Sequence, residues 1–270
     1  EAMAAPSIAL IGAGRMGAAL TRGWLAGKGK PDIRIQDPKP SEIVAAWAEA
    51  GKVRLNPDPE PVDVLIVAVK PQVFPKMADS LKAWIGPDTL VISIMAGTRI
   101  KQLIERLDTK CVIRVMPNTP GAIGKGVSVI ARSDTVMAKQ LEIAENLLKP
   151  LGAVIGPVDE KHMSVVTGLS GSGPAYIFLL AEAMADAAMA EGLPADLAEQ
   201  LAALTIEGAA ALMVQSDEPP SALRKAVTSP GGTTQAALDI LMDEGGMPIL
   251  MRKAIRAAAN RDRELSRDTD

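Results

Sequence analysis

A glycine-rich turn near the start of the chain has the residue types and the spacing that bind a phosphate group. The turn, Gly12-Ala13-Gly14-Arg15-Met16-Gly17, follows the strand-like run Ser7–Ile11 and leads into an Ala- and Leu-rich stretch of helical type. In such a turn Gly12 can adopt a backbone conformation closed to other residues, Gly14 lets the main chain approach a pyrophosphate, and Gly17 permits close packing of helix on strand. Because the amide groups at the helix start would then face the anion, the segment predicts a dinucleotide site.

Two further glycine-bearing segments have groups that bind a small carboxylate. Residues 168–176 read Gly-Leu-Ser-Gly-Ser-Gly-Pro-Ala-Tyr, and residues 228–234 read Thr-Ser-Pro-Gly-Gly-Thr-Thr. Each precedes a predicted helix, where hydroxyl-bearing residues, proline and glycine often serve only as caps and turns. Each also presents free amides and hydroxyls at a helix N-terminus, which is a receptor for an anion. The residues leave both interpretations open.

The single cysteine and the single histidine argue against several other chemistries. Cys111, alone, can form no intrachain disulfide, and its strand-like surroundings favour a buried core thiol over a nucleophile. His162 has no second histidine or cysteine cluster beside it, so we expect neither a transition-metal site nor a Ser-His-Asp triad. The chemistry is therefore expected to come from a bound cofactor, with no metal.

Length and composition limit the class of protein. A chain of 270 residues with 48% hydrophobic content predicts two domains, each with its own core. A net charge of −3 and an aromatic content of 2% give neither attraction for nucleic acid nor a platform for stacking bases. We identify no secretory signal and expect no stretch near the roughly 18 apolar residues that span a bilayer. The expectation is a soluble, cytoplasmic protein without membrane or nucleic-acid partners.

Strands and helices alternate through the first half of the chain. Strand patterns occupy residues 7–11, 33–36, 53–55, 64–68, 90–94 and 111–116, and helical patterns occupy residues 41–50 and 98–107. The apolar run over residues 64–68 is typical of a strand buried on both faces of a parallel sheet. This order predicts a doubly wound, Rossmann-type sheet, in which ligands bind beyond the carboxyl ends of the strands.

The second half is predicted to be helical. From about Gly156 onward strand alternation gives way to stripes of helical period, one over residues 177–187 and one over residues 197–212 that includes Gly208. These Ala-rich helices bury little area each, so we expect a homodimer formed through this half. The predicted fold class is α/β, with an N-terminal Rossmann-type domain at residues 1–157 and a C-terminal all-α dimerisation and substrate domain at residues 158–270.

Five motifs in order make the chain resemble the pyrroline-5-carboxylate reductase family. They are Gly12-Ala13-Gly14-Arg15-Met16-Gly17, Ala68-Val69-Lys70-Pro71, Met116-Pro117-Asn118-Thr119-Pro120, Ser170-Gly171-Ser172-Gly173-Pro174-Ala175-Tyr176 and Ser229-Pro230-Gly231-Gly232-Thr233-Thr234. The resemblance implies reduction of 1-pyrroline-5-carboxylate to L-proline with NADPH or NADH, the last step of proline synthesis. It also implies a homodimer through interlocked helical domains, and it leaves open a ring of such dimers.

The resemblance also implies roles for individual residues. Thr234 would be catalytic, donating a hydrogen bond to the ring nitrogen, and Ser229 would hold the substrate carboxylate together with the amides near Gly232, Thr233 and Thr234. Asp217 would lie near the substrate. The expected cofactor-binding residues are Ile11, Gly12, Ala13, Gly14, Arg15, Met16, Gln36, Asp37, Asn56, Ala68, Val69, Lys70, Pro71, Met95 and Ala96. Lys70 is open to two interpretations, a solvated strand end or an alternative proton donor.

The sequence leaves the cofactor preference and two other functions open. Asp37 suits an unmodified ribose, whereas Lys39 and Arg15 would neutralise a 2′-phosphate, so we expect both cofactors to be used. Another NAD(P)-dependent enzyme of this architecture, such as a hydroxyacid dehydrogenase or a different imine reductase, is the first alternative. A non-catalytic, dinucleotide-sensing or dimeric interaction protein is the second.

Overall fold

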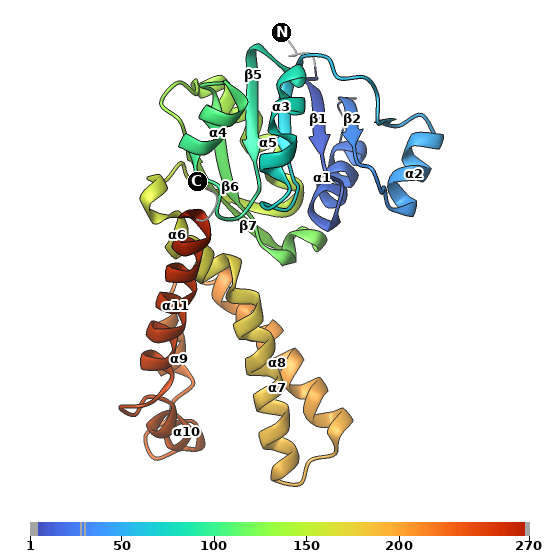
Figure 1. Cartoon of the computed structure of the whole chain (residues 1–270). Coiled ribbons are helices and arrows are strands. Elements are labelled where there is room, and N and C mark those ends of the chain that lie inside the picture. The colour runs from blue at the N-terminus through green and yellow to red at the C-terminus, as the bar shows by residue number, and fades with distance from the viewer. Residues whose placement is uncertain (1–4, 28, 30, 268–270) are drawn as a thin grey trace. The chain divides into compact units, whose positions relative to one another are not determined.

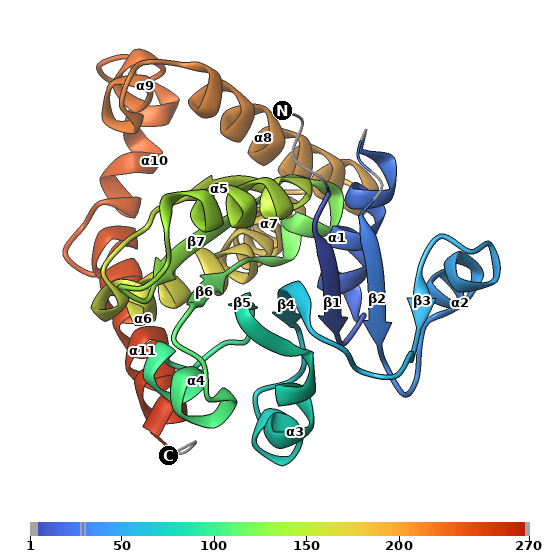
Figure 2. The ribbon, with the colours of Figure 1, turned by 90° about the horizontal axis from the view of Figure 1, so that it is seen from above.

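The computed structural model describes residues 5–27, 29 and 31–267. The chain divides into two compact units, one made of the residues up to Gly171 and from Ala257 onward, the other of Ser172–Arg256. The first unit contains one eight-stranded sheet, in the order β3-β2-β1-β4-β5-β6-β7-β8 (Figure 2). The strands are β1 (Ser7–Ile11), β2 (Asp32–Gln36), β3 (Arg54–Leu55), β4 (Val62–Val67), β5 (Ile85–Ser93), β6 (Val112–Met116), β7 (Gly126–Arg132) and β8 (Gly152–Ile155).

The sheet confirms the predicted Rossmann-type architecture and adds two strands to it. Strands β1 to β6 pair in parallel, as the alternation of strands and helices indicated. Strand β7 pairs antiparallel with β6, and β8 runs parallel to β7. The sequence pattern did not predict these two strands, because β7 follows β6 without a crossover helix and β8 is only four residues long.

Helices cover both faces of this sheet. On one face, Ile8 and Leu10 of β1 share a core with residues of α1 (Arg15–Ala26), α2 (Glu42–Glu49) and α5 (Ala138–Leu148). On the other face, Ala9 and Ile11 pack with residues of α3 (Phe74–Leu81), α4 (Ile100–Leu107) and α6 (Met163–Val166). Because successive strand side chains point to opposite faces, one apolar strand supplies both cores. The glycine turn that follows β1 is therefore held on a rigid frame.

The second unit is helical and has a very small core of its own. It contains α7 (Gly173–Ala190), α8 (Ala195–Gln215), α9 (Pro220–Ala226), α10 (Thr233–Leu241) and the first part of α11 (Met247–Arg267). Helices α7 and α8 run side by side (Figure 1) and bury only the small residues Ala185, Ala198 and Ala202 between them. The predicted helices are confirmed, but their stripes of large apolar side chains are exposed. Exposed members of the stripes include Ile177, Leu201, Leu204 and Leu212.

Gly208 lies in the exposed stripe of α8. A Cβ added at Gly208 would meet no atom within 4 Å in the part of the chain that the structure describes. Gly208 therefore does not pack closely against another helix within the described chain. An exposed apolar stripe of this extent marks an interaction surface.

Two helical stretches are long and apolar enough, by length and composition, to cross a membrane. They are Glu160–Ala190, with a mean hydropathy of 1.3, and Ala195–Gln215, with a mean hydropathy of 1.4, and 11% of each apolar window is buried within the chain. The expectation that no stretch reaches this length is therefore wrong. The physical reason is that many alanines, added to leucine and isoleucine, raise the mean hydropathy although few side chains are large.

Candidate active site

The glycine turn after β1 has the geometry that its sequence predicted. Gly12 adopts a φ of +89°, and a Cβ at this position would lie 2.7 Å from the carbonyl oxygen of Ala68. A Cβ at Gly17 would lie 2.6 Å from the carbonyl oxygen of Gly12. Both distances are too short for a side chain, so Gly12 and Gly17 are required by the fold itself.

Gly14 differs from its two neighbours because the fold leaves space around it. A Cβ added at Gly14 would meet no atom within 4 Å among the described residues. Gly14 is the N-cap of α1, which has no side-chain cap and no acidic residue in its first turn. The first amides of a helix carry partial positive charge, so this open and uncapped start fits the phosphates of a dinucleotide.

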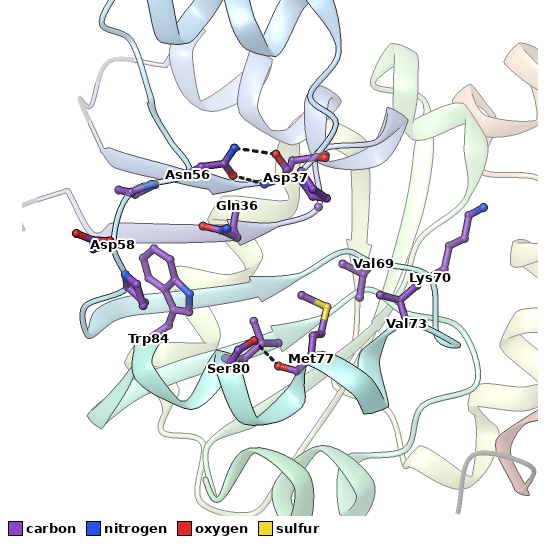
Figure 3. Close-up of a pocket in the computed structure, with 15 residues that line it drawn as sticks. Gln36, Asp37, Asn56, Asp58, Val69, Lys70, Val73, Met77, Ser80 and Trp84 are labelled. Carbon is purple, nitrogen blue, oxygen red and sulfur yellow. Dashed lines mark hydrogen bonds between the residues drawn. The ribbon is translucent and has the colours of Figure 1, made fainter.

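A cavity of about 740 Å³ lies beyond the carboxyl ends of β1, β2 and β4 (Figure 3). This volume is within the range of small-molecule and cofactor sites. Six predicted cofactor residues line the cavity: Gly12, Gln36, Asp37, Asn56, Val69 and Lys70. The other nine, which do not line it, are Ile11, Ala13, Gly14, Arg15, Met16, Ala68, Pro71, Met95 and Ala96.

Several residues that line the cavity were not predicted. They are Pro38, Pro57, Asp58, Pro59, Val73, Met77, Ser80, Leu81 and Trp84. Trp84, buried in a short 3-10 helix at Lys82–Trp84, and Met77 of α3 give the cavity an apolar wall. Figure 3 shows Ser80 and Met77 across the cavity from Asn56 and Asp37. An apolar wall opposite a polar one suits a flat heterocyclic ring attached to a ribose.

The polar wall is held together by hydrogen bonds. The amide of Asp37 donates to Oδ1 of Asn56 at 2.8 Å, and Nδ2 of Asn56 donates to the carbonyl oxygen of Asp37 at 2.9 Å. The carboxylate of Asp37 accepts from the amide of Ala13 at 2.9 Å and from the amide of Lys39 at 2.8 Å. The end of β2, the end of β3 and the glycine turn are thus connected through Asp37.

Two of the motifs that lie far apart in sequence meet within the first unit. Nδ2 of Asn118, which follows β6, donates to the carbonyl oxygen of Ser170 at 3.0 Å. Oδ1 of Asn118 accepts from the amide of Val127 at 2.9 Å. A Cβ at Gly171 would lie 2.7 Å from Cε of Met116, the end of a flexible side chain, so Gly171 and Met116 pack closely together. The contacts assign these motif residues a structural role.

The Ser229–Thr234 loop leads into α10 in the helical unit. The amide of Gly232 donates to the carbonyl oxygen of Ser229 at 3.0 Å, and Gly231 adopts a φ of +66°. Gly232 is the N-cap of α10, and no side chain caps this helix. Thr233 and Thr234 therefore stand in its first turn, beside amides that no side-chain cap occupies. Four of the predicted substrate residues, Ser229, Gly232, Thr233 and Thr234, lie in this short loop as their sequence positions require.

Asp217, Cys111 and His162 take no part in this loop. Asp217 is exposed between α8 and α9, and none of the hydrogen bonds among the described residues joins it to the loop. Burial raises the pKa of the half-buried Cys111 thiol, although its hydrogen bond to Oε1 of Gln140 opposes the change. His162 is exposed at the end of a 3-10 turn. Within the described ranges, no group of three or more His, Cys, Asp and Glu residues is arranged to hold a metal ion.

Comparison with known proteins identifies the family. Pyrroline-5-carboxylate reductases from Glycine max and Pseudomonas aeruginosa are each 37% identical to this chain. The first alignment covers 96% of both chains, and the second covers 98% of both. The chain belongs to the pyrroline-5-carboxylate reductase family. Residues 160–265 match the model for pyrroline-5-carboxylate reductase dimerisation, and residues 7–97 match that for coenzyme F420-dependent NADP oxidoreductases.

Solved structures of the pyrroline-5-carboxylate reductase family share the fold. The enzyme from Coxiella burnetii superposes with a TM-score of 0.88 at 32% identity, covering 96% of this chain and 98% of that one. The pyrroline carboxylate reductase from Plasmodium falciparum, solved with NADP bound, gives a TM-score of 0.81 at 25% identity, covering 98% and 99%. Both comparisons extend over the Rossmann-type and the helical parts of the chain.

Gly14→Val is expected to weaken cofactor binding while the fold survives. The branched side chain would enter space that no described residue fills, where we expect the phosphates. We expect the dissociation constant for NADPH, measured by calorimetry, to rise more than about tenfold. As a matched comparison, Gly17→Ala places a Cβ 2.6 Å from a carbonyl oxygen and should mainly lower the melting temperature. Unchanged NADPH affinity in Gly14→Val would show that the phosphates bind elsewhere.

Proposed function

We propose that this chain reduces 1-pyrroline-5-carboxylate to L-proline with NADPH or NADH, the last step of proline biosynthesis. The observation that carries the proposal is the open glycine turn, with its adjoining cavity, in a chain that belongs to this family over nearly its whole length. Residues 1–157 bind the dinucleotide, and residues 158–270 pair with a second copy and bind the substrate.

The chemistry requires positioning more than activation. The bound cofactor supplies a hydride, and a protonated cyclic imine is already electrophilic at its C=N carbon. The Thr234 hydroxyl donates a hydrogen bond to the lone pair of the neutral imine nitrogen and relays to it the proton that makes the ring electrophilic. Ser229 and the amides of Gly232, Thr233 and Thr234 hold the carboxylate, which fixes the ring. Positioning of this kind is worth roughly 7–11 kcal/mol of barrier.

The start of α10 supports this role for the loop. Hydroxyl-bearing residues at a helix start commonly act as side-chain caps, which was the alternative for this segment. Here the N-cap is Gly232, and α10 has no side-chain cap. The first amides of α10 and the hydroxyls of its first turn therefore suit an external carboxylate better than they suit capping. Asp217 is assigned to the substrate surroundings only by the resemblance.

The helical half forms a homodimer. Helices α7 and α8 leave large apolar side chains exposed, and both lie inside residues 160–265, which match the dimerisation model. A second copy would cover these side chains, so their high hydropathy is explained by pairing rather than by a membrane. A ring of such dimers is compatible with this pairing. We place the enzyme in the cytoplasm and propose no membrane partner for it.

Asp37→Ser is expected to shift cofactor preference toward NADPH. The Asp37 carboxylate lines the cavity, and each of its oxygens, already bonded once, keeps room for a further hydrogen bond from a ribose hydroxyl. Its negative charge disfavours a 2′-phosphate. The ratio of kcat/KM with NADPH to that with NADH should therefore rise. Asp58→Ser, which removes another acid from the same cavity, should change the ratio less. A ratio that does not rise in Asp37→Ser would show that this carboxylate faces away from the ribose.

The proposed function is tested by one steady-state assay. NADPH or NADH oxidation should depend on added pyrroline-5-carboxylate and should yield proline. Oxidation driven instead by a 2-oxo acid or by a different imine would favour another oxidoreductase of this architecture. Cofactor binding without turnover on any of these substrates would favour a dinucleotide-sensing protein.

A further inference from the structure

Asn56 stands at the end of β3 in an unusual backbone conformation. Its φ is +48°, in the left-handed region that asparagine and glycine adopt more readily than other residues. Its amide donates to the carbonyl oxygen of Ile35 at 2.8 Å, a backbone hydrogen bond between the end of β3 and β2. The side chain is thereby directed toward the backbone of Asp37, the first residue beyond β2 (Figure 3).

The side chain of Asn56 forms the two hydrogen bonds with the backbone of Asp37 that a neighbouring strand would otherwise form. Its oxygen accepts from the amide of Asp37 at 2.8 Å, and its Nδ2 donates to the carbonyl oxygen of the same residue at 2.9 Å. A carboxamide offers one acceptor and one donor side by side, as a paired strand would. Aspartate in this place would keep the acceptor but lose the donor, and glycine would lose both.

The Asp37 that Asn56 holds is connected in turn to the phosphate-binding turn. Oδ2 of Asp37 accepts from the amide of Ala13, and Oδ1 accepts from the amide of Lys39. Both the backbone and the carboxylate of Asp37 are therefore fixed by hydrogen bonds within the chain. Holding a recognition group in place in this way removes part of the ordering cost of binding.

We infer that Asn56 is a positioning residue for the cofactor, which acts through Asp37 to set both the conformation of the glycine turn and the choice between NADPH and NADH. The inference rests on the proposed use of both cofactors and adds how the site distinguishes them. The two hydrogen bonds between the Asn56 side chain and the Asp37 backbone are called the Asn56 clamp. Loss of this clamp frees the Asp37 backbone, so the carboxylate no longer stays where it favours an unmodified ribose. NADH affinity then falls more than NADPH affinity.

The test is a double-mutant cycle on the full chain, with dissociation constants for NADPH and NADH measured by calorimetry. Asn56→Gly removes the clamp and keeps the left-handed backbone accessible, and Asn56→Asp keeps half of it. We expect Asn56→Gly to raise the ratio of the NADH to the NADPH dissociation constant by about threefold to tenfold. Asn56→Asp should produce a smaller change in the same direction, and in the Asp37→Ser background Asn56→Gly should produce little further change.

Lys52→Gly is the matched control, because it places a glycine at an exposed residue shortly before β3. This variant should leave the ratio of the NADH to the NADPH dissociation constant near that of wild type. A lowered melting temperature in Asn56→Gly with an unchanged ratio would overturn the inference and assign Asn56 a structural role. An equal effect in the wild-type and Asp37→Ser backgrounds would also overturn it, because the action would not pass through Asp37. Failure of the wild-type chain to bind either cofactor would instead contradict the proposed function.

Discussion

Thr234→Ala is expected to lower kcat by about tenfold to a thousandfold, which corresponds to the loss of a contact worth about 1.5–4 kcal/mol. The proposed hydrogen bond reaches the ring nitrogen, whose charge changes during the reaction, so its loss affects the transition state more than the bound substrate. Cofactor affinity should stay near that of wild type. Steady-state kinetics with varied pyrroline-5-carboxylate, together with NADPH binding by calorimetry, provide the measurement.

Ser229→Ala is the comparison for Thr234→Ala within the same loop. Ser229 is proposed to hold the carboxylate, which does not react, so the main effect should be a raised KM with kcat less affected. If the two residues only stabilised the start of α10, each variant would lose about 1 kcal/mol of stability and keep near-normal kinetics. Near-normal turnover of Thr234→Ala with a lowered melting temperature would contradict the assignment and make Lys70, which lines the cavity, the candidate proton donor.

Leu204→Asp is expected to break the homodimer and to abolish most activity. Leu204 is 55% exposed on α8, in a unit whose buried core consists of three alanines. In the proposed dimer the new carboxylate at position 204 would be buried against the second copy. The free-energy cost of removing this charge from water exceeds the free energy gained from the contact. Because we propose that the helical half completes its core with a second copy, kcat/KM should fall by more than about tenfold. Light scattering at the assay concentration would measure the mass, and steady-state kinetics the activity.

Lys139→Asp is the matched control for Leu204→Asp. It introduces the same side chain at an exposed position on α5, outside the helical unit. This variant should remain dimeric and active. A monomeric Leu204→Asp variant with full activity would contradict the requirement for pairing, and an unaltered dimer would show that this stripe is not the contact surface.

The sequence predicted the parts of the site that depend on local steric rules. Gly12 and Gly17 lie where a Cβ would meet a carbonyl oxygen, and such constraints follow from the order strand, turn, helix. The two-domain order and the start of α10 were also readable, because helical period and glycine-rich turns are local signals. The same rules assigned Gly14 to the approach of a pyrophosphate, and the described residues leave open space around it.

The parts that the sequence did not predict depend on contacts between distant segments. Trp84 and Met77 have the same apolar character as core residues, so composition does not reveal that they line a cavity. Asn56 was assigned to the cofactor by resemblance, whereas its two hydrogen bonds to Asp37 become visible only when β2 and β3 are paired. The exposure of the α8 stripe likewise requires the packed chain, since a periodic stripe predicts burial without specifying the partner.

The most direct measurement follows the hydride itself. Reduction of pyrroline-5-carboxylate with cofactor deuterated on the transferred face of nicotinamide C4 should give L-proline with one deuterium at Cδ, the carbon of the former C=N bond. Mass spectrometry and NMR of the product locate the label. Deuterium at Cδ of proline, formed in step with cofactor oxidation, is the result predicted here. Cofactor oxidation that yields no proline, or proline without the label, would contradict hydride transfer to the cyclic imine.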